Sequence, residues 1–371
     1  MSKIAIVSLV TALFAAGCTS MPRAPLNSPQ ASVIQDIPGA RVTPLESQRL
    51  FQGSGRRPLQ ILALSGGGAD GAYGAGFLAG WAQTGQRPEF DIVTGSSVGA
   101  LIAPFAFLGP EYDPALKQAM TAGLADDLLQ WAGADAIIGA SVYESAPLRD
   151  LIARYADDAL IEAVAVRHRA GKRLFVATTN VDTQSTTLWN MGEIAASNSQ
   201  QRHDLFRRIL AASAAIPGIF PPVLIEVRTG GKDYVEMHVD GGVSSNVTPV
   251  PEVLLTSSRK IPKSRLFVII NGKLGGDPAY TTDHTLPIVI RSFQTAVKAN
   301  TRNTMIATYG FCQRNGWECS ATAVDPSISS PRGVANFDQK YMEALYKFGS
   351  EKGASGSWFN LSLHKDGMIG F

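Results

Sequence analysis

The chain has 371 residues, of which 45% are apolar and 17% charged, and its formal net charge is +2. This composition is typical of a globular protein with a sizeable core, and the small net charge argues against a nucleic-acid partner or strong attraction to acidic lipid. No window contains the ~20 apolar residues that a membrane-spanning helix needs.

The first residues are typical of an export signal. Lys3 precedes an apolar run, residues 4–16, that is too short to span a membrane but suits a signal peptide. The run ends in "AAGC", which resembles the lipobox of bacterial lipoproteins, and this implies a signal peptide over residues 1–17 and a lipid anchor on Cys18. Thr19 rather than Asp follows the cysteine, which by the same resemblance implies the outer membrane of the bacterial cell envelope. The alternative is an ordinary cleaved signal peptide with an incidental cysteine.

Residues 18–57 contain five prolines and predict a tether between this anchor and a folded body. Within them, the apolar piece "SVIQDIPGARV" is expected to pack on the body. A free chain of ~40 residues spans roughly 35 Å, so the body could reach a membrane surface from an anchor at Cys18. No later change in composition marks a second boundary, and residues 58–371 are expected to form one domain.

From residue 59 onward, strand-like and helix-like segments alternate. Strands are expected at 59–64, 90–95, 173–179, 186–190, 234–239 and 265–271. Helices are expected at 71–85, 97–108, 113–132, 145–155, 202–215, 285–308 and 336–352. This alternation predicts an α/β fold with three layers, α/β/α, around a mostly parallel central sheet.

The stretch "SGGGADG" lies between the first strand and the first helix of this pattern. Gly66, Gly68 and Gly71 satisfy the G-x-G-x-x-G spacing of a dinucleotide-binding loop, and Asp91 lies 20 residues further on. However, the acid that binds ribose belongs at the carboxyl end of the second strand, whereas Asp91 stands at its start. Asp70 would also place a negative charge beside the pyrophosphate.

Consecutive glycines at a helix N-terminus suit the binding of an oxyanion better than the binding of a dinucleotide. Their backbone N–H groups are left unpaired and can stabilise negative charge on a carbonyl oxygen during acyl transfer. Gly66, Gly67 and Gly68 are therefore the candidate oxyanion hole. The structural alternative is a glycine turn that only permits close packing of helix on strand.

The second strand runs into "GSSVG", which is a G-x-S-x-G motif with Ser97 at its centre. A strand, a sharp turn and a helix form the nucleophile elbow that exposes a serine hydroxyl at the edge of a sheet. Gly95 and Gly99 leave room for the turn and for a close crossing of backbones. Ser97 is therefore the candidate nucleophile.

A nucleophilic serine needs a base. His284 and His364 follow Ser97 in the order of a histidine-containing triad, but neither stands at a glycine-flanked strand end. Asp240 does, because it ends the strand "YVEMHV" and precedes two glycines, so its carboxylate is the stronger candidate. His238 has the same strand parity as Asp240 and could line the same site.

Taken together, "GGGADG", "GSSVG", "AASAAIPGIFPPV" and "DGG" resemble the patatin-like phospholipases over residues 59–355. The resemblance implies a Ser97–Asp240 dyad without histidine, in which Ser97 attacks an ester carbonyl and Asp240 takes its proton. It also implies that N–H groups of the glycine loop hold the oxyanion and that water releases the acyl-enzyme. Pro217 matches a turn of the family, for which a purely structural role is the alternative.

One residue departs from the family pattern. A basic residue usually precedes the last glycine of the loop, and Asp70 stands there instead. An aspartate would repel a phosphate, which puts a preference for phospholipids in doubt more than it does ester hydrolysis. The expected substrate is a lipid ester: a phospholipid, a lysophospholipid or a neutral glyceride.

The remaining cysteines, Cys312 and Cys319, lie seven residues apart and could form a disulfide in an exported protein, with two buried free thiols as the alternative. No metal-type cluster of cysteine and histidine occurs in the sequence, and no cofactor is expected.

The second hypothesis for function is a non-catalytic envelope lipoprotein that uses the same fold to bind lipid or a partner.

Overall fold

The computed structural model of the chain describes residues 22–23, 32–43, 46, 49, 58–121, 146–255, 262–328 and 337–360. The predicted signal peptide, Cys18 and His364 lie outside the described residues. None of the helices in the described part of the chain combines the length and apolar composition that crossing a membrane requires.

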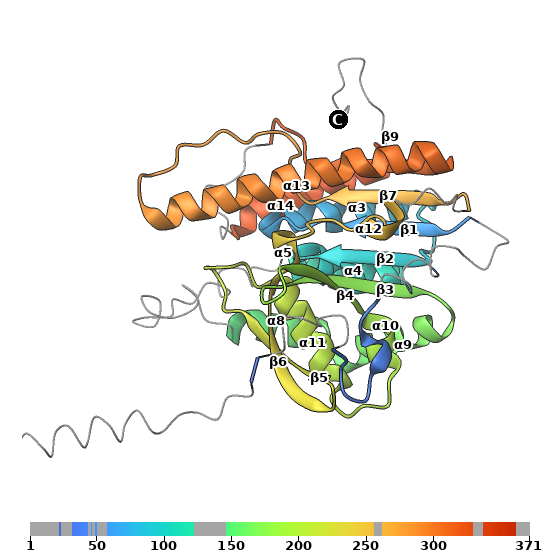
Figure 1. Ribbon diagram of the computed structural model, residues 1–371. Helices are drawn as coiled ribbons and strands as arrows, with labels where there is room; N and C mark the ends of the chain where they lie inside the picture. The colour runs from blue at the N-terminus through green and yellow to red at the C-terminus, as the bar shows by residue number, and fades with distance from the viewer. Residues whose placement is uncertain are drawn as a thin grey trace, which may run out of the picture.

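A nine-stranded sheet in the order β5-β6-β3-β2-β1-β7-β8-β9, with β4 also paired to β3, forms the centre of the molecule (Figure 1). The strands are β1 (Gln60–Leu64), β2 (Ile92–Ser96), β3 (Arg173–Asn180), β4 (Ser185–Asn190), β5 (Val223–Thr229), β6 (Lys232–Asp240), β7 (Arg265–Ile270), β8 (Glu318–Ala323) and β9 (Phe359–Asn360). The five strands β3-β2-β1-β7-β8 are parallel to one another. Strands β4 and β6 pair antiparallel with β3, β9 pairs antiparallel with β8, and β5 pairs antiparallel with β6. The sheet is thus mixed but parallel at its centre, as the alternating pattern predicts.

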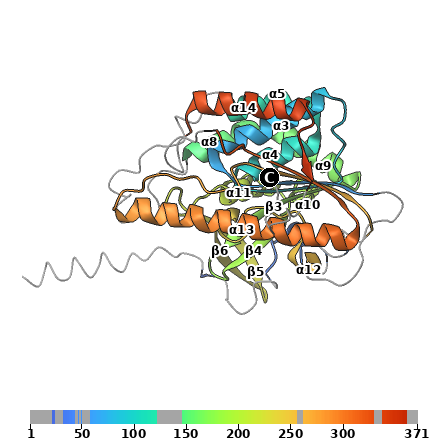
Figure 2. The ribbon, with the colours of Figure 1, turned by 90° about the horizontal axis from the view of Figure 1, so that it is seen from above.

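Helices cover both faces of this sheet (Figure 2). They are α3 (Gly71–Gln83), α4 (Val98–Leu108), α5 (Asp113–Thr121), α8 (Ala146–Tyr155), α9 (Asp158–Arg169), α10 (Met191–Ala196), α11 (Arg202–Ser213), α12 (Glu252–Leu255), α13 (Thr285–Asn315) and α14 (Gln339–Ala354). Short 3-10 turns are η2 (Pro38–Ala40), η3 (Gly68–Asp70), η4 (Pro110–Tyr112) and η5 (Gly241–Val243). Seen from above, α12 and α13 lie on one side, and α3, α4, α5 and α14 lie on the other.

Strand β1 illustrates why both faces are covered. Its side chains alternate between two apolar cores: Leu62 and Leu64 belong to one, Ile61 and Ala63 to the other. All four are fully buried. Because successive side chains of a strand point to opposite faces, a strand that is apolar at every position needs a helical layer on each side. The three-layer α/β/α prediction is therefore confirmed.

Several elements were not expected from the sequence. The strands β5, β8 and β9 and the helices α9, α10 and α12 have no counterpart among the predicted segments. Helix α9 is nevertheless marked in the sequence, because the Asp157 carboxylate accepts a 2.8 Å hydrogen bond from Leu160 N–H and caps its first turn. Strand β8, "ECSATA", carries little apolar character of its own and forms by pairing with β7.

The predicted apolar piece of the tether lies on the body. Ile34, Ile37 and Ala40 are buried and belong to the larger core. Val33 pairs with Arg228 of β5 through two backbone hydrogen bonds of 3.0 and 2.8 Å. Residues 32–43 thus behave as part of the folded body.

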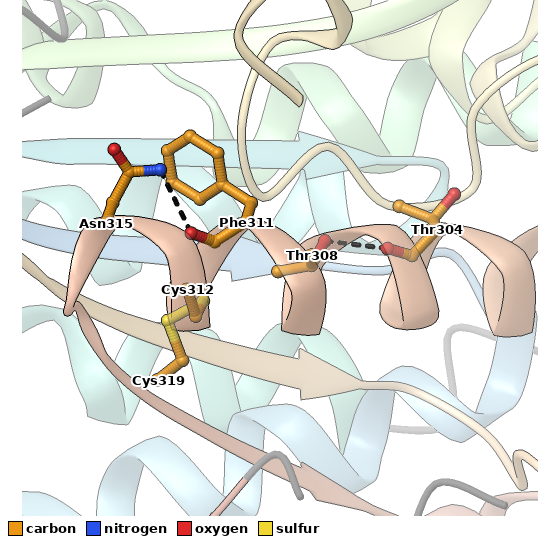
Figure 3. Close-up of a disulfide and its surroundings, with 6 residues drawn as sticks. All are labelled: Thr304, Thr308, Phe311, Cys312, Asn315 and Cys319. Atoms are coloured by element: carbon orange, nitrogen blue, oxygen red, sulfur yellow. Dashed lines mark hydrogen bonds between the residues drawn. A yellow bond between two sulfur atoms is a disulfide. The ribbon is translucent and has the colours of Figure 1, made fainter. Parts of the chain in front are cut away.

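Cys312 and Cys319 are joined by a disulfide (Figure 3). Cys312 lies in the last turns of α13, and Cys319 lies at the start of β8. The bond ties the end of the long helix to the sheet that it covers, next to the contact between the Phe311 and Trp317 rings.

Candidate active site

The turn between β2 and α4 holds Ser97 in a strained conformation. Its φ of 54° and ψ of −129° are rare for a residue with a side chain, and such strain is common where a side chain is held for function. A side chain on Gly95 would lie 2.4 Å from the carbonyl oxygen of Gly99, and one on Gly99 would lie 2.5 Å from that of Leu64. The glycines of the motif therefore permit the close backbone crossing that the sequence predicts.

The register of the sheet brings Asp240 to Ser97. Strand β4 occupies one edge of β3 along 175–180, so β2 and β6 share the other edge. On that edge Ser96 of β2 pairs with Ala177, and Asp240 of β6 pairs with Thr178, the next residue. Two strands of opposite direction thus end head to head, and the residues at their carboxyl ends meet.

The two side chains form a direct hydrogen bond. Ser97 Oγ donates to Asp240 Oδ2 over 2.6 Å, and the other carboxylate oxygen accepts from Gly242 N–H over 2.7 Å. Only 3% of Asp240 is exposed. Burial raises the pKa of Asp240 to about 7, although both hydrogen bonds act in the opposite direction. A carboxyl group that titrates near neutral pH is well suited to exchange a proton with a serine hydroxyl.

The glycine loop packs directly against the serine. A side chain on Gly66 would lie 2.8 Å from the Cβ of Ser97, and one on Gly67 would lie 1.6 Å from the carbonyl oxygen of Asn271. Gly66 N–H donates to the carbonyl of Asn246 over 3.0 Å, so this N–H group is not available to bind an oxyanion. Gly67 and Gly68 have no such backbone bond among the described residues. Their N–H groups are the loop's remaining candidates for binding an oxyanion.

Ser213 supports the elbow from behind and was not singled out in the sequence. Its hydroxyl accepts a 3.0 Å hydrogen bond from Ser97 N–H and donates to the carbonyl of Ala177 over 2.7 Å. The segment that follows α11 also holds Asp240, whose N–H donates to the carbonyl of Ala215 over 2.9 Å. Ser213 and Ala215 both belong to "AASAAIPGIFPPV", one of the four stretches that resemble the family, so the sequence marked this segment but not Ser213 itself. Pro217 itself is exposed.

The described histidines lie away from this pair. His284 is at the start of α13 with a side chain 80% exposed. His238 is fully buried but faces Thr178 Oγ1 and Glu236 Oε2 at 2.9 and 3.1 Å. Burial lowers the pKa of His238, so it is a neutral member of a structural network. Within the described residues, no group of three His, Cys, Asp or Glu side chains is arranged to hold a metal ion.

A cavity of about 490 Å³ opens beside Ser97 and Asp240. The loop Gly66–Gly68 forms part of its wall, and apolar side chains from β7 and α13 form another part, including Ile270, Phe293 and Val297. The cavity therefore combines a hydroxyl–carboxyl pair and backbone donors with apolar surface, the combination expected of a site for an ester with a hydrocarbon chain.

Asp70, the residue that departs from the family pattern, lies in the same cavity. Its Oδ1 accepts a 2.6 Å hydrogen bond from the hydroxyl of Tyr341 on α14. Burial raises the pKa of Asp70 to about 6, against the lowering effects of Tyr341, Lys273 and Lys298. Asp91 lies at the opposite end of β2 and pairs with Lys172 over 2.8 Å, which removes the basis for a dinucleotide site.

Comparison with known proteins identifies a family for this chain. A family model described as "Patatin-like phospholipase" matches residues 62–254, just over half of the chain, including Ser97 and Asp240. Among solved structures, VipD from Legionella pneumophila is similar with 14% identity and a TM-score of 0.41, over 82% of this chain and 68% of VipD. The type III effector protein ExoU is similar with 12% identity and a TM-score of 0.31, over 81% of this chain and 53% of ExoU. No curated protein matches the sequence.

Proposed function

The chain belongs to the patatin-like phospholipase family, and on that premise we propose that it is a lipid acyl hydrolase with a Ser97–Asp240 dyad. The observation that carries this proposal is the 2.6 Å hydrogen bond from Ser97 Oγ to Asp240 Oδ2 on a strained turn beside a glycine loop. Among the described residues, the Ser97 hydroxyl has Asp240 and no histidine as its hydrogen-bond partner, so we assign Asp240 as the base.

In the proposed reaction, Ser97 Oγ attacks the ester carbonyl as its proton passes to Asp240. The negative charge that develops on the carbonyl oxygen is held by the N–H groups of Gly67 and Gly68. The proton then returns from Asp240 to the departing alcohol, which leaves an acyl group on Ser97. Water, deprotonated by the same carboxylate, releases the fatty acid and restores the serine.

We also propose that Cys18 carries a lipid anchor, that residues 1–17 are its signal peptide and, because Thr19 rather than Asp follows the cysteine, that the anchor lies in the outer membrane. The basis is the "AAGC" ending of an apolar run after Lys3. The wild-type protein should incorporate radiolabelled palmitate and a Cys18→Ser variant should not, while the esterase activity of the variant is retained. Absence of the label from the wild-type protein would refute the anchor.

The dyad is tested with three ester substrates: a short p-nitrophenyl ester, a phosphatidylcholine and its lyso form. Ser97→Ala and Asp240→Asn should each lower kcat/KM by several orders of magnitude, because one removes the nucleophile and the other the base. A fluorophosphonate should label Ser97 in the wild-type protein, as detected by mass spectrometry.

His284→Ala and His364→Ala are the matched controls, since a histidine-containing triad would need one of them. Both should retain wild-type activity. Activity that survives in Ser97→Ala would refute the dyad, and activity that is lost in either histidine variant would favour a triad.

A further inference from the structure

Three basic side chains line the cavity: Lys273, Arg291 and Lys298. Lys273 and Lys298 lie close enough to Asp70 to lower its pKa. Lys273 follows strand β7, and the other two lie on α13. Residues seven apart on a helix lie on the same face, so α13 presents Arg291 and Lys298 to the cavity together. Figure 2 shows α13 running along one side of the sheet.

Their side chains are held by polar groups of the cavity wall. Lys273 is 7% exposed and pairs with Asp277 Oδ1 over 2.9 Å. Arg291 donates to the backbone carbonyl of Asp277. Lys298 Nζ makes a longer contact, 3.4 Å, with the carbonyl of Gly275. Lys273 is thus buried in the wall, whereas Arg291 and Lys298 are half-buried and held at it by carbonyl groups.

The cations of the cavity wall are not each matched by a carboxyl group. Among the described residues, the wall has three cations and three carboxyl groups, of which Asp240 is engaged by Ser97 and Gly242. The three cations therefore share the other two carboxyl groups, Asp70 and Asp277. Burial lowers the pKa of Lys298, and Arg291 and Lys273 lower it further, although Asp277 acts in the opposite direction. A partly buried part of the wall with a net positive charge attracts an anion, because the anion offsets that charge.

The glycine loop connects this charge to the proposed nucleophile. Gly66 packs on Ser97, and Asp70, four residues later, faces Lys273 and Lys298. In a glycerophospholipid, the phosphate is only a few bonds from the ester carbonyl. An ester held at Ser97 would therefore direct its phosphate along the loop toward the basic side chains.

We propose that Lys273 and Lys298 bind the phosphate group of a glycerophospholipid substrate and supply, from β7 and α13, the positive charge that the loop lacks at Asp70. This inference rests on the proposed lipid acyl hydrolase function. From the sequence, Asp70 was expected to weaken phosphate recognition. In the folded chain, however, Asp70 lies near Lys273 and Lys298, which follow it by some 200 residues in the sequence, and the proposal reverses that expectation.

The test compares two substrates with the same acyl chain, a lysophosphatidylglycerol and a monoacylglycerol, in neutral detergent micelles. The wild-type protein should have the higher kcat/KM for the phospholipid. Lys298→Gln should lower the ratio of the two kcat/KM values about tenfold or more, the loss expected for one charge-assisted hydrogen bond. Lys298→Arg should preserve most of the ratio.

Arg302→Gln is the matched control, because Arg302 is an exposed residue of the same helix outside the cavity. It should leave the ratio at its wild-type value. A ratio unchanged in Lys298→Gln, or a wild-type preference for the monoacylglycerol, would overturn the proposal.

Calorimetric titration with glycerol 3-phosphate separates the phosphate site from the reaction. Binding to the wild-type protein and to Arg302→Gln, together with its loss in Lys298→Gln, supports the site even if no ester is cleaved. Absence of binding to the wild-type protein overturns it, whatever the activity.

Discussion

The carboxyl group of Asp240 is kept in an unfavourable environment. It is buried at the end of β6, and its pKa rises from an ordinary value of 3.8 to about 7. Between these two pH values the native state holds a proton that the unfolded chain has released. Native stability therefore falls as pH rises through this window, and above it the full cost, up to about 4 kcal/mol, is present.

This cost predicts that Asp240→Asn stabilises the protein as it abolishes activity. An asparagine can accept from Gly242 N–H and donate to Ser97 Oγ without any buried charge. At pH 8 its melting temperature should exceed that of the wild-type protein by a few degrees. The difference should shrink as pH falls through 7 toward 4, where the native carboxyl is already protonated. Calorimetric melting curves across this range measure it, and an equal gain at every pH would contradict this account of Asp240.

At the same scale, the sequence predicted the pairing of Ser97 with Asp240, which the structure brings within hydrogen-bond distance, but not the surroundings of the pair. Ser97 and Asp240 stand at strand ends between glycines, and that local pattern carries the information. Ser213, Lys273 and Lys298 carry no such pattern. A serine in a helix or a lysine after a strand is ordinary in sequence, and only the folded chain brings them to the site.

At the scale of elements, helices α3 and α14 pack with their backbones in close approach. A side chain on Gly80 of α3 would lie 1.9 Å from the carbonyl oxygen of Ser350, and one on Gly349 of α14 would lie 2.2 Å from that of Tyr73. Gly76 and Gly353 stand in the same position relative to the partner helix. Two glycines four residues apart on each helix thus form the contact.

This contact predicts that Gly80→Ala and Gly349→Ala each destabilise the protein by about 1–3 kcal/mol, because the helices must move apart. Gly310→Ala on α13 is the control, since a side chain there would meet only the guanidinium group at the end of the Arg314 side chain, 3.2 Å away. It should be neutral or stabilising by up to about 1 kcal/mol, as expected for alanine in a helix. Urea unfolding measures all three. Similar losses in all three variants would indicate that glycine flexibility, not helix contact, matters.

The elements themselves were partly predictable. Strands β1, β3 and β7 follow from their apolar runs, because they are buried on both faces. Strand β8 does not, because its pairing with β7, not its composition, fixes it. Local sequence patterns also do not predict the order of the strands in the sheet. They therefore did not predict that the carboxyl ends of β2 and β6 meet beside β3, on which the site depends.

At the scale of the whole molecule, the segment 32–43 fastens the N-terminal region to the strand that carries Asp240. The guanidinium group of Arg41 donates to both carboxylate oxygens of Glu236 on β6, and it lies 4.8 Å from the centre of the Trp189 ring. The Glu236 side chain is 1% exposed. Burial alone would raise its pKa, but hydrogen bonds from His238 and Arg41 outweigh burial and lower it to about 2.

Two further residues shorten the expected tether. The carbonyl of Pro22 accepts from Val235 N–H over 3.0 Å, and Arg23 pairs with Asp182. Contacts with the body therefore begin four residues after Cys18. If Cys18 carries a lipid, four residues reach at most about 14 Å, so the β5–β6 side of the body would lie close to the membrane surface.

The contact of Arg41 with Glu236 yields the last prediction. Arg41→Ala leaves the Glu236 carboxylate buried without its cation, which should cost about 3–5 kcal/mol at neutral pH. Because the pKa of Glu236 is lowered in the native state, its contribution to stability is complete above pH 4.5 and is lost as pH falls toward 2. The loss caused by Arg41→Ala should accordingly be smaller at about pH 3, and Glu236→Gln in the Arg41→Ala background should recover part of the loss at neutral pH. Urea unfolding at the two pH values measures both effects. An equal loss at both, with no recovery by Glu236→Gln, would mean that Arg41 acts through its packing on Trp189 and not through its charge.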